Sequence, residues 1–191
     1  MGNFIDKDDI KTELNTTDTT FNTLLDLLAA AIESMWDELT CRTWYTTTHT
    51  EYHRAPERTN KIFLKNYPVT SVAYLYDDPD WEYGAASLIS SSDYHTNADN
   101  GVVVYDGYFY EGDDNIKIVY TAGYTASNVP AWLKQLLVRQ ACHWFEQAKN
   151  KRWHVSSESH PGGGTISYSQ LKDNLLPEFM MLAGIHKPVN M

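Results

Sequence analysis

A strand that leads directly into a helix is encoded by Ile116-Lys117-Ile118-Val119-Tyr120-Thr121-Ala122-Gly123-Tyr124, a short polar turn, and Val129-Pro130-Ala131-Trp132-Leu133-Lys134-Gln135-Leu136-Leu137. Alternation of Ile116, Ile118 and Tyr120 with Lys117 and Val119 is typical of a half-buried strand. Pro130 suits the first turn of a helix, where a backbone N–H has no partner in any case. The buried face predicted for this helix consists of Leu133, Leu136, Leu137, Ala141, Trp144, Phe145 and Ala148.

Two helical stretches precede the strand region. Asp6 is expected to cap a short helix that contains Ile10 and Leu14. The polar run 15–18 predicts a break, with Asp18 or Thr19 as the cap of the next helix. Apolar residues then recur at three- and four-residue spacing and predict an amphipathic helix of about six turns. They are Phe21, Leu24, Leu25, Leu28, Ile32, Met35, Trp36 and Leu39.

The region from about 45 to 125 has the composition of a small sheet of five or six strands. Strands are predicted at 45–52, 61–65, 69–76, 102–105 and 116–120. Tyr67-Pro68 is expected to bend the chain, and Asn100-Gly101 is a tight-turn dipeptide. An acidic loop, Asp77 to Tyr83, interrupts this sheet, and residues 78–84 are expected to form a solvated acidic turn.

These elements predict an α+β fold, with a mainly helical core of two long helices plus short terminal helices and a small antiparallel β-sheet as an insertion. We expect residues 1–191 to form a single domain. Its helical parts are expected at about 6–41 and 130–183, and its β-rich insertion at about 45–125. A mobile loop is expected at about 151–174, which contains Pro161-Gly162-Gly163-Gly164. Pro177 opens the last short helix, and Gly184 is expected to stop it.

Composition and charge exclude several classes of protein. The formal net charge of −10 gives no net attraction for a phosphate backbone, so ordinary DNA binding is not expected. No apolar run approaches the roughly 20 residues that span a bilayer. Residues 1–9 are polar and acidic, unlike a signal peptide. Cys41 and Cys142 are far apart in the sequence and could pair only if the fold brings them together; two buried thiols in a reduced compartment are the favoured expectation.

The patterns of catalytic and metal sites are incomplete, so we predict neither an enzyme nor a cofactor. Residues 78–84 space carboxylates as a calcium loop does, but an EF-hand needs glycine at the position held by Tyr83. His49 and His53 lie in a predicted strand, roughly 13 Å apart. The glycines after His160 accompany no G-x-S-x-G nucleophile and no phosphate-loop lysine.

Aromatic residues are abundant in the strand region and leave an alternative open. Exposed on one face, they would stack on sugars, as in a carbohydrate-binding module. The favoured interpretation is that they fill a small sheet and its subunit contacts. They are Tyr74, Tyr76, Trp81, Tyr83, Tyr105, Tyr108, Phe109 and Tyr110.

Several segments, in the same order, resemble the head–tail connector, or neck adaptor, family of tailed bacteriophages. The helix ending in Cys41-Arg42-Thr43-Trp44 is similar to the second helix of that family. Residues 61–72 resemble its strand–proline–strand turn, and Tyr120-Thr121-Ala122-Gly123-Tyr124 with Val129-Pro130 resembles the start of its third helix. Ser156-Ser157-Glu158, the glycines and Ile166-Ser167-Tyr168-Ser169 are similar to the loop before its last helix.

The resemblance implies a structural virion protein of the neck, made and assembled in the host cytoplasm. Family adaptors form a ring, usually twelvefold, beneath the portal protein; the ring extends the DNA channel and docks stopper or tail-completion proteins. Packaged DNA would pass through without sequence-specific binding, and no membrane or cofactor is implied. The alternatives are a glycan-binding tail or baseplate module and, closer to the adaptor, another neck protein such as a stopper or tail-completion protein.

The resemblance also implies that the C-terminal arm contacts the portal. A subunit without residues 175–191 is accordingly expected to fold but not to join portals. The candidate portal or neck interface residues are Trp153, Ser157, Glu158, Tyr168, Leu175 and Phe179.

Overall fold

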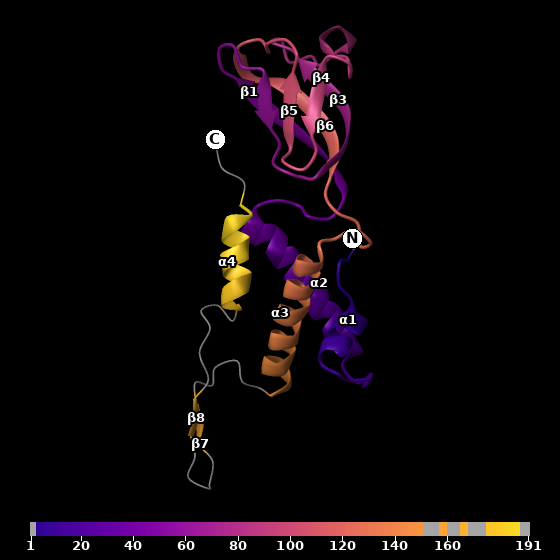
Figure 1. The fold of residues 1–191 in the computed structure, drawn as a ribbon, viewed down its shortest axis with the longest axis vertical. Helices are drawn as coiled ribbons and strands as arrows, with labels where there is room; N and C mark the ends of the chain where they lie inside the picture. The colour runs from indigo at the N-terminus through magenta and orange to yellow at the C-terminus, as the bar shows by residue number, and fades with distance from the viewer. Residues whose placement is uncertain (1–2, 151–156, 160–164, 168–174, 188–191) are drawn as a thin grey trace. The chain divides into compact units, whose positions relative to one another are not determined.

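The chain divides into a helical unit and a β-rich unit (Figure 1). The computed structural model describes residues 3–150, 157–159, 165–167 and 175–187. The helical unit comprises Met1–Cys41 and Asn128–Met191, and the β-rich unit comprises Arg42–Ser127. The predicted α+β class is confirmed, with four α-helices and small antiparallel sheets in the described part of the chain.

Helix α1 (Lys7–Glu13) begins with a reciprocal capping box. Asp6 Oδ1 accepts hydrogen bonds from the backbone N–H groups of Asp8 (2.8 Å) and Asp9 (2.9 Å), and the Asp9 carboxylate accepts from the Asp6 N–H (3.2 Å). The bonds satisfy N–H groups that no helical carbonyl reaches. The cap predicted at Asp6 is confirmed.

Helix α2 (Asn22–Thr40) starts later than predicted. Asp18 accepts hydrogen bonds from the N–H and hydroxyl of Thr20 at 2.9 and 2.7 Å, which closes a turn before the helix. The position before Asn22 is Phe21, which supplies no side-chain cap bond. The cap predicted at Asp18 or Thr19 is therefore wrong, because the Asp18 carboxylate is already engaged with Thr20 in that turn.

Helices α3 (Ala131–Lys149) and α4 (Pro177–Ile185) complete the helical unit. Pro130 lies immediately before α3, and Pro177 is the first residue of α4, as predicted. The stop predicted at Gly184 is wrong, because α4 continues through it to Ile185. A glycine inside a helix costs only about 1 kcal/mol, and the helix packing tolerates it here.

The core of the helical unit is built around Trp36 of α2. Its ring lies edge-to-face with Phe179 of α4, at a centroid distance of 5.2 Å, and with Trp132 of α3, at 6.4 Å. Phe21 and Phe145 make a similar contact at 5.4 Å. The buried apolar residues of this unit are Phe4, Ile5, Ile10, Leu25, Ala29, Ile32, Trp36, Leu133, Leu136, Leu137, Val138, Ala141, Phe145, Leu175, Phe179 and Ala183.

The β-rich unit contains two three-stranded antiparallel sheets rather than the one expected. In the first, β6 (Gly112–Ala122) lies between β1 (Thr47–Ala55) and β3 (Val69–Asp77). In the second, β5 (Val102–Tyr105) lies between β2 (Lys61–Phe63) and β4 (Tyr94–Asn97). A 3-10 turn, η1, spans Ala85–Ser87. A separate hairpin pairs β7 (Ser157–Ser159) with β8 (Thr165–Ser167).

The two three-stranded sheets share one core. Ile116, Ile118 and Tyr120 of β6 are fully buried, while Lys117 and Val119 between them are half-exposed, so the alternation predicted for this strand is confirmed. The remaining core residues come from both sheets and the loops that join them. They are Ala55, Ile62, Leu64, Val69, Leu75, Val103, Phe109 and Ala122.

Candidate interaction surfaces

The six residues predicted to contact the portal do not form one described surface. Trp153 and Tyr168 lie outside the described residues. Ser157 and Glu158 belong to β7, where the backbone pairs them with Ser167 and Ile166. Leu175 and Phe179 are 6% and 0% exposed, so their side chains belong to the core of the helical unit and present no free surface.

Helix α4 is anchored at both ends. The buried amide of Gln140 accepts a hydrogen bond from Leu176 N–H (2.8 Å), and Arg139 forms an ion pair with Glu178 (3.3 Å). At the other end, the His186 ring stacks on Trp132 with centroids 5.1 Å apart. The expectation that a subunit lacking 175–191 stays folded therefore needs correction, because the deletion would uncover the Trp36 core.

The outer side of α4 is apolar and exposed. Met180, Met181 and Ile185 are 43%, 61% and 66% exposed. Sequence reasoning missed this surface, although residues 179–183 are apolar without a polar side, which is unusual for a surface helix. An exposed apolar helix face beside anchored core residues is typical of an interaction surface.

A network of polar side chains orders the chain around residues 64–67 of the β-rich unit. The Tyr120 hydroxyl donates to the Glu51 carboxylate and accepts from Asn66 N–H (3.2 Å), and His53 lies 3.1 Å from Glu51. Burial acts to raise the pKa of Glu51, but the hydrogen bonds from His53, Tyr120 and Lys65 outweigh it and hold that pKa below its ordinary value. The pKa of Tyr120 is raised, chiefly by burial and then by Glu51.

Arg42 marks the start of the β-rich unit and is almost completely buried. Its guanidinium lies 3.9 Å from the Trp44 ring centroid and 3.8 Å from that of Tyr67, and Nη2 donates to the Tyr67 carbonyl at 2.9 Å. Thr43 N–H donates to the Asn66 side chain at 2.8 Å. These contacts make Arg42 a structural residue, since a charge sandwiched between two rings is unavailable to a ligand.

Asp77, the last residue of β3, and Asp78, which follows it, hold neighbouring segments in place, so the expectation of a solvated turn at residues 78–84 is wrong for Asp78. Asp77 accepts from Tyr110 N–H (2.8 Å) and the Asn115 amide (2.9 Å), and burial raises its pKa. Asp78 accepts from Tyr83 N–H (2.7 Å) and the Ser87 hydroxyl (2.8 Å), and these hydrogen bonds lower its pKa, the Ser87 bond most. Both residues are only 8% exposed.

The aromatic residues singled out in the sequence divide between different parts of the β-rich unit. Tyr74, Trp81, Tyr108 and Tyr110 are exposed, whereas Phe109 is buried. Tyr74 and Tyr76 lie on β3, while Tyr105 lies on β5 in the other sheet. A single stacking face, which the glycan-binding interpretation requires, is therefore not formed by these eight residues.

Lys117 lies among three tyrosines on the outer side of the β1–β6–β3 sheet. Its Nζ is 5.9 Å from the Tyr52 ring centroid, 5.8 Å from that of Tyr76 and 4.9 Å from that of Tyr83. Tyr52 was not among the aromatic residues considered in the sequence, because only strand pairing opposite Lys117 brings it there. We refer to these four residues as the tyrosine–lysine cluster.

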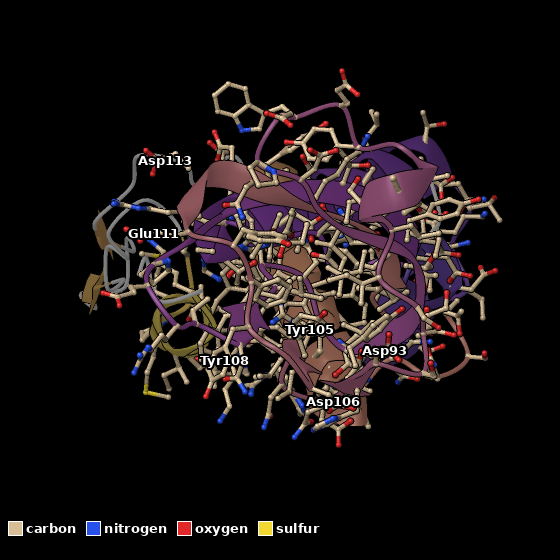
Figure 2. The ribbon with its side chains drawn as sticks, turned by 90° about the horizontal axis from the view of Figure 1, so that it is seen from above. Asp93, Tyr105, Asp106, Tyr108, Glu111 and Asp113 are labelled. Atoms are coloured by element: carbon tan, nitrogen blue, oxygen red, sulfur yellow. The ribbon has the colours of Figure 1, made fainter. Side chains whose placement is uncertain are left out.

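A second surface combines carboxylates with an exposed aromatic ring. Figure 2 shows Tyr108 between Glu111 on one side and Asp93 and Asp106 on the other. The Asp106 N–H donates to the Asp93 carbonyl at 2.8 Å, which holds the two acidic residues together. Tyr108 is 68% exposed. We refer to Asp93, Asp106, Tyr108 and Glu111 as the acidic patch.

The described part of the chain holds no group of three or more His, Cys, Asp or Glu side chains that could bind a metal ion. Within the same residues, no helix combines the length and apolar character needed to cross a membrane. Of the two cysteines, Cys41 is exposed and Cys142 is half-buried, and both are free thiols. The expectation of two buried thiols is wrong for Cys41, because this residue ends α2 on its exposed side.

A family model described as head completion protein matches residues 4–184. The chain belongs to the head completion protein family. The match includes both the helical and the β-rich unit, so the β-rich insertion lies within the region that the family model spans. No curated protein matches the chain.

Solved structures similar to this head completion protein come from gene transfer agent (GTA) particles. A chain in the neck of an empty GTA particle, computed with C6 symmetry, has a TM-score of 0.60 at 16% identity over 98% of this chain and 91% of its own length. A chain in the virion of the native GTA particle has a TM-score of 0.58 at 15% identity, with the same coverage of both chains. A chain in the neck of the native particle, computed with C12 symmetry, has a TM-score of 0.51 at 17% identity over 97% and 92%.

Membership of the head completion protein family confirms the role expected from the resemblance, that of a structural head–tail connector of the virion. Head completion proteins have a structural role. Membership also favours the connector over the glycan-binding alternative, in agreement with the division of the aromatic residues between two sheets.

Proposed function

We propose that this protein assembles as a ring beneath the portal, twelvefold in the complete neck, where it extends the DNA channel and docks a stopper or tail-completion protein. The observation that carries the proposal is the family match over residues 4–184. Similarity of fold to chains from necks computed with C6 and C12 symmetry supports a ring. Closed rings are also the usual outcome when one chain repeats a head-to-tail contact.

The size and charge of the chain suit a channel subunit. A compact chain of this length has a radius of gyration of about 16 Å, too small to enclose a DNA duplex unless several copies surround it. The β-rich unit carries twelve Asp and Glu against six Lys and Arg, and the whole chain has a net charge of −10. Repulsion of phosphates would let duplex DNA slide through without being retained.

The helices, chiefly α2 and α3, supply the adaptor core and much of the ring wall in this proposal. The anchored helix α4 presents Met180, Met181 and Ile185 toward the portal, and Trp153, Ser157, Glu158 and Tyr168 belong to the same C-terminal arm. Leu175 and Phe179 hold α4 in place from the core. The apolar outer face of α4 supports this assignment, because exposed methionine side chains adapt readily to a partner surface.

Electron microscopy of the full chain mixed with its own portal tests the proposal. A ring stacked coaxially on the portal is the expected result. Density for this chain on the side of another neck protein that faces away from the portal would instead favour a stopper or tail-completion role. Failure to join portals or necks in any arrangement would contradict a connector ring.

Variants of α4 test its contact with the portal. Met181→Asp and Ile185→Asp should each weaken portal binding at least tenfold, because each places a charge on a surface that becomes desolvated. Ser34→Asp, at an exposed position of α2, is the matched control and should bind normally. Equal binding by all three variants would remove α4 from the interface.

A further inference from the structure

The tyrosine–lysine cluster is placed by strand register. Tyr52 of β1 and Tyr76 of β3 are both paired with Lys117 of β6, one on each side. Tyr52 and Tyr83 lie 5.6 Å apart between ring centroids, and Tyr76 and Tyr83 lie 6.3 Å apart. The three rings therefore surround a single ammonium group on the outer side of the sheet.

The loop that supplies Tyr83 is held in a strained conformation. Trp81, Tyr83 and Asp114 have φ values of 59°, 49° and 54°, in the left-handed region that side chains other than glycine rarely adopt. The Tyr83 hydroxyl donates to the Asp114 carbonyl (2.5 Å), and the Trp81 indole donates to the Asp113 carbonyl (3.0 Å). Strain of this kind persists only where surrounding contacts over-determine the backbone conformation.

Lys117 has no carboxylate partner within ion-pair distance among the residues that the structure describes. The neighbouring cation Arg54 is already paired with Asp113 at 2.9 Å. A half-buried ammonium over aromatic rings keeps its affinity for an anion, since the rings neutralise only part of its charge. The cluster consequently suits a surface that offers a carboxylate together with an aromatic or apolar side chain.

The acidic patch has this composition. Asp93, Asp106 and Glu111 are exposed carboxylates that lie on either side of the exposed Tyr108 in the view of Figure 2. Asp106 also lies 3.8 Å from His95 Nδ1. Asp106 and Tyr108 belong to the loop that leaves β5, in the sheet that does not contain Lys117. One copy of the chain therefore carries two different and complementary surfaces on its β-rich unit.

We propose that the tyrosine–lysine cluster of one copy binds the acidic patch of the next copy around the ring. The inference rests on the proposed ring and assigns its subunit contact. Because two different surfaces meet, the contact is head-to-tail, the type that propagates around a closed ring. The tyrosines supply the buried contact area, and Lys117 selects the acidic patch and sets the register.

Charge exchange between the two surfaces tests the contact in portal-bound rings of the full chain. Lys117→Glu should raise the concentration needed for half-maximal ring assembly at least tenfold, and the double variant Asp93→Lys with Asp106→Lys should do the same. A chain that carries Lys117→Glu, Asp93→Lys and Asp106→Lys together should recover most of the lost ring assembly. Lys61→Glu, at an exposed lysine of β2, is the matched control and should assemble normally.

Lys117→Met keeps the aliphatic stem and covers the case in which Lys117→Glu fails to fold. It should also weaken assembly, with a thermal unfolding midpoint close to that of the unmodified protein. Normal assembly by this variant, or no recovery in the charge-exchanged triple variant, would overturn the proposal. If the unmodified chain formed no rings, the proposed ring would be overturned, and this outcome is distinct from a failure of the proposed subunit contact.

Photo-crosslinking identifies directly which protein contacts the tyrosine–lysine cluster. Benzoylphenylalanine in place of Tyr52 should give, in assembled necks, an adduct with residues 93–111 of another copy, identified by mass spectrometry. An adduct with the portal or another neck protein would overturn the assignment to a second copy.

Discussion

The indole ring of Trp36 and the phenyl ring of Phe179 meet edge-to-face, with centroids 5.2 Å apart and planes inclined at 70°. Both residues are buried, so this contact attaches α4 to α2. Phe179→Ala should lower the free energy of unfolding by about 3–5 kcal/mol, because it opens a cavity beside Trp36. Met181→Ala, on the exposed side of the same helix, should change it by no more than about 0.5 kcal/mol. Urea unfolding followed by tryptophan fluorescence would measure both, and equal effects would contradict the anchoring of α4.

Gly123 has a φ of +109°, and a Cβ there would lie 2.7 Å from the Trp44 carbonyl oxygen. Gly123→Ala should therefore destabilise the β-rich unit by more than about 1 kcal/mol, since both the backbone and the space disfavour a side chain. Gly184→Ala is the matched control, because Gly184 lies in α4 with nothing within 4 Å of the added Cβ. This second change should stabilise the protein by up to about 1 kcal/mol. Thermal unfolding of the two variants would check the opposite signs.

The Tyr120 hydroxyl connects Glu51 to the segment around Asn66. Tyr120→Phe should cost about 1–3 kcal/mol of unfolding free energy, because it leaves the Glu51 carboxylate and the Asn66 N–H without this partner in a buried site. Tyr108→Phe, at an exposed ring, should be neutral within about 0.5 kcal/mol. Denaturant titrations at pH 7 compare the two, and a neutral Tyr120→Phe variant would show that the network adds nothing to stability.

The same hydroxyl predicts a dependence on alkaline pH. The pKa of Tyr120 is raised in the folded protein, chiefly by burial, so the unfolded chain loses this proton first. The stability that the group contributes is therefore complete below the ordinary tyrosine pKa of about 10 and is lost as pH rises beyond it, by about 1.4 kcal/mol per pH unit. The difference in unfolding free energy between the unmodified protein and Tyr120→Phe should thus shrink between pH 9.5 and 11, on the order of this slope. A constant difference would argue against the raised pKa.

The two thiols should react at different rates. Cys41 is exposed, whereas Cys142 is half-buried and burial raises its pKa to about 11. At pH 8 a chromogenic disulfide reagent should modify Cys41 rapidly and Cys142 slowly, because the thiolate is the reactive form. The Cys41→Ser variant should show the slow phase alone, and a fast phase in that variant would contradict the burial of Cys142.

Local signals in the sequence predicted the parts of the fold that depend on near neighbours. Asp6 and Asp9 predict their capping box because both partners lie within one helical turn. Ile116, Ile118 and Tyr120 predict a buried strand face because side chains alternate along a strand. Asp18 misled the prediction of the α2 start, since a carboxylate before a helix can equally close a turn with its own neighbours.

The candidate surfaces were less predictable because they join residues far apart in the chain. Tyr52 and Tyr76 lie beside Lys117 only through the pairing of β1, β6 and β3, and Tyr83 joins them from the loop after β3. Phe179 was a reasonable candidate for a portal contact, yet its burial against Trp36 depends on how α4 packs. Asp77 begins an acidic loop in the sequence, yet its carboxylate accepts hydrogen bonds from Tyr110 and Asn115, which lie 33 and 38 residues further along the chain.

The α+β class, the order of helices and strands, the acidic character of the chain and, through collinear motifs, its family could all be inferred from the amino-acid sequence. The exposed side of α4, the division of the strands into two sheets and the set of tyrosines around Lys117 became known only from the folded chain. Caps, turns and periodicity act over a few residues, whereas burial and surface composition depend on contacts between segments that are far apart in the sequence.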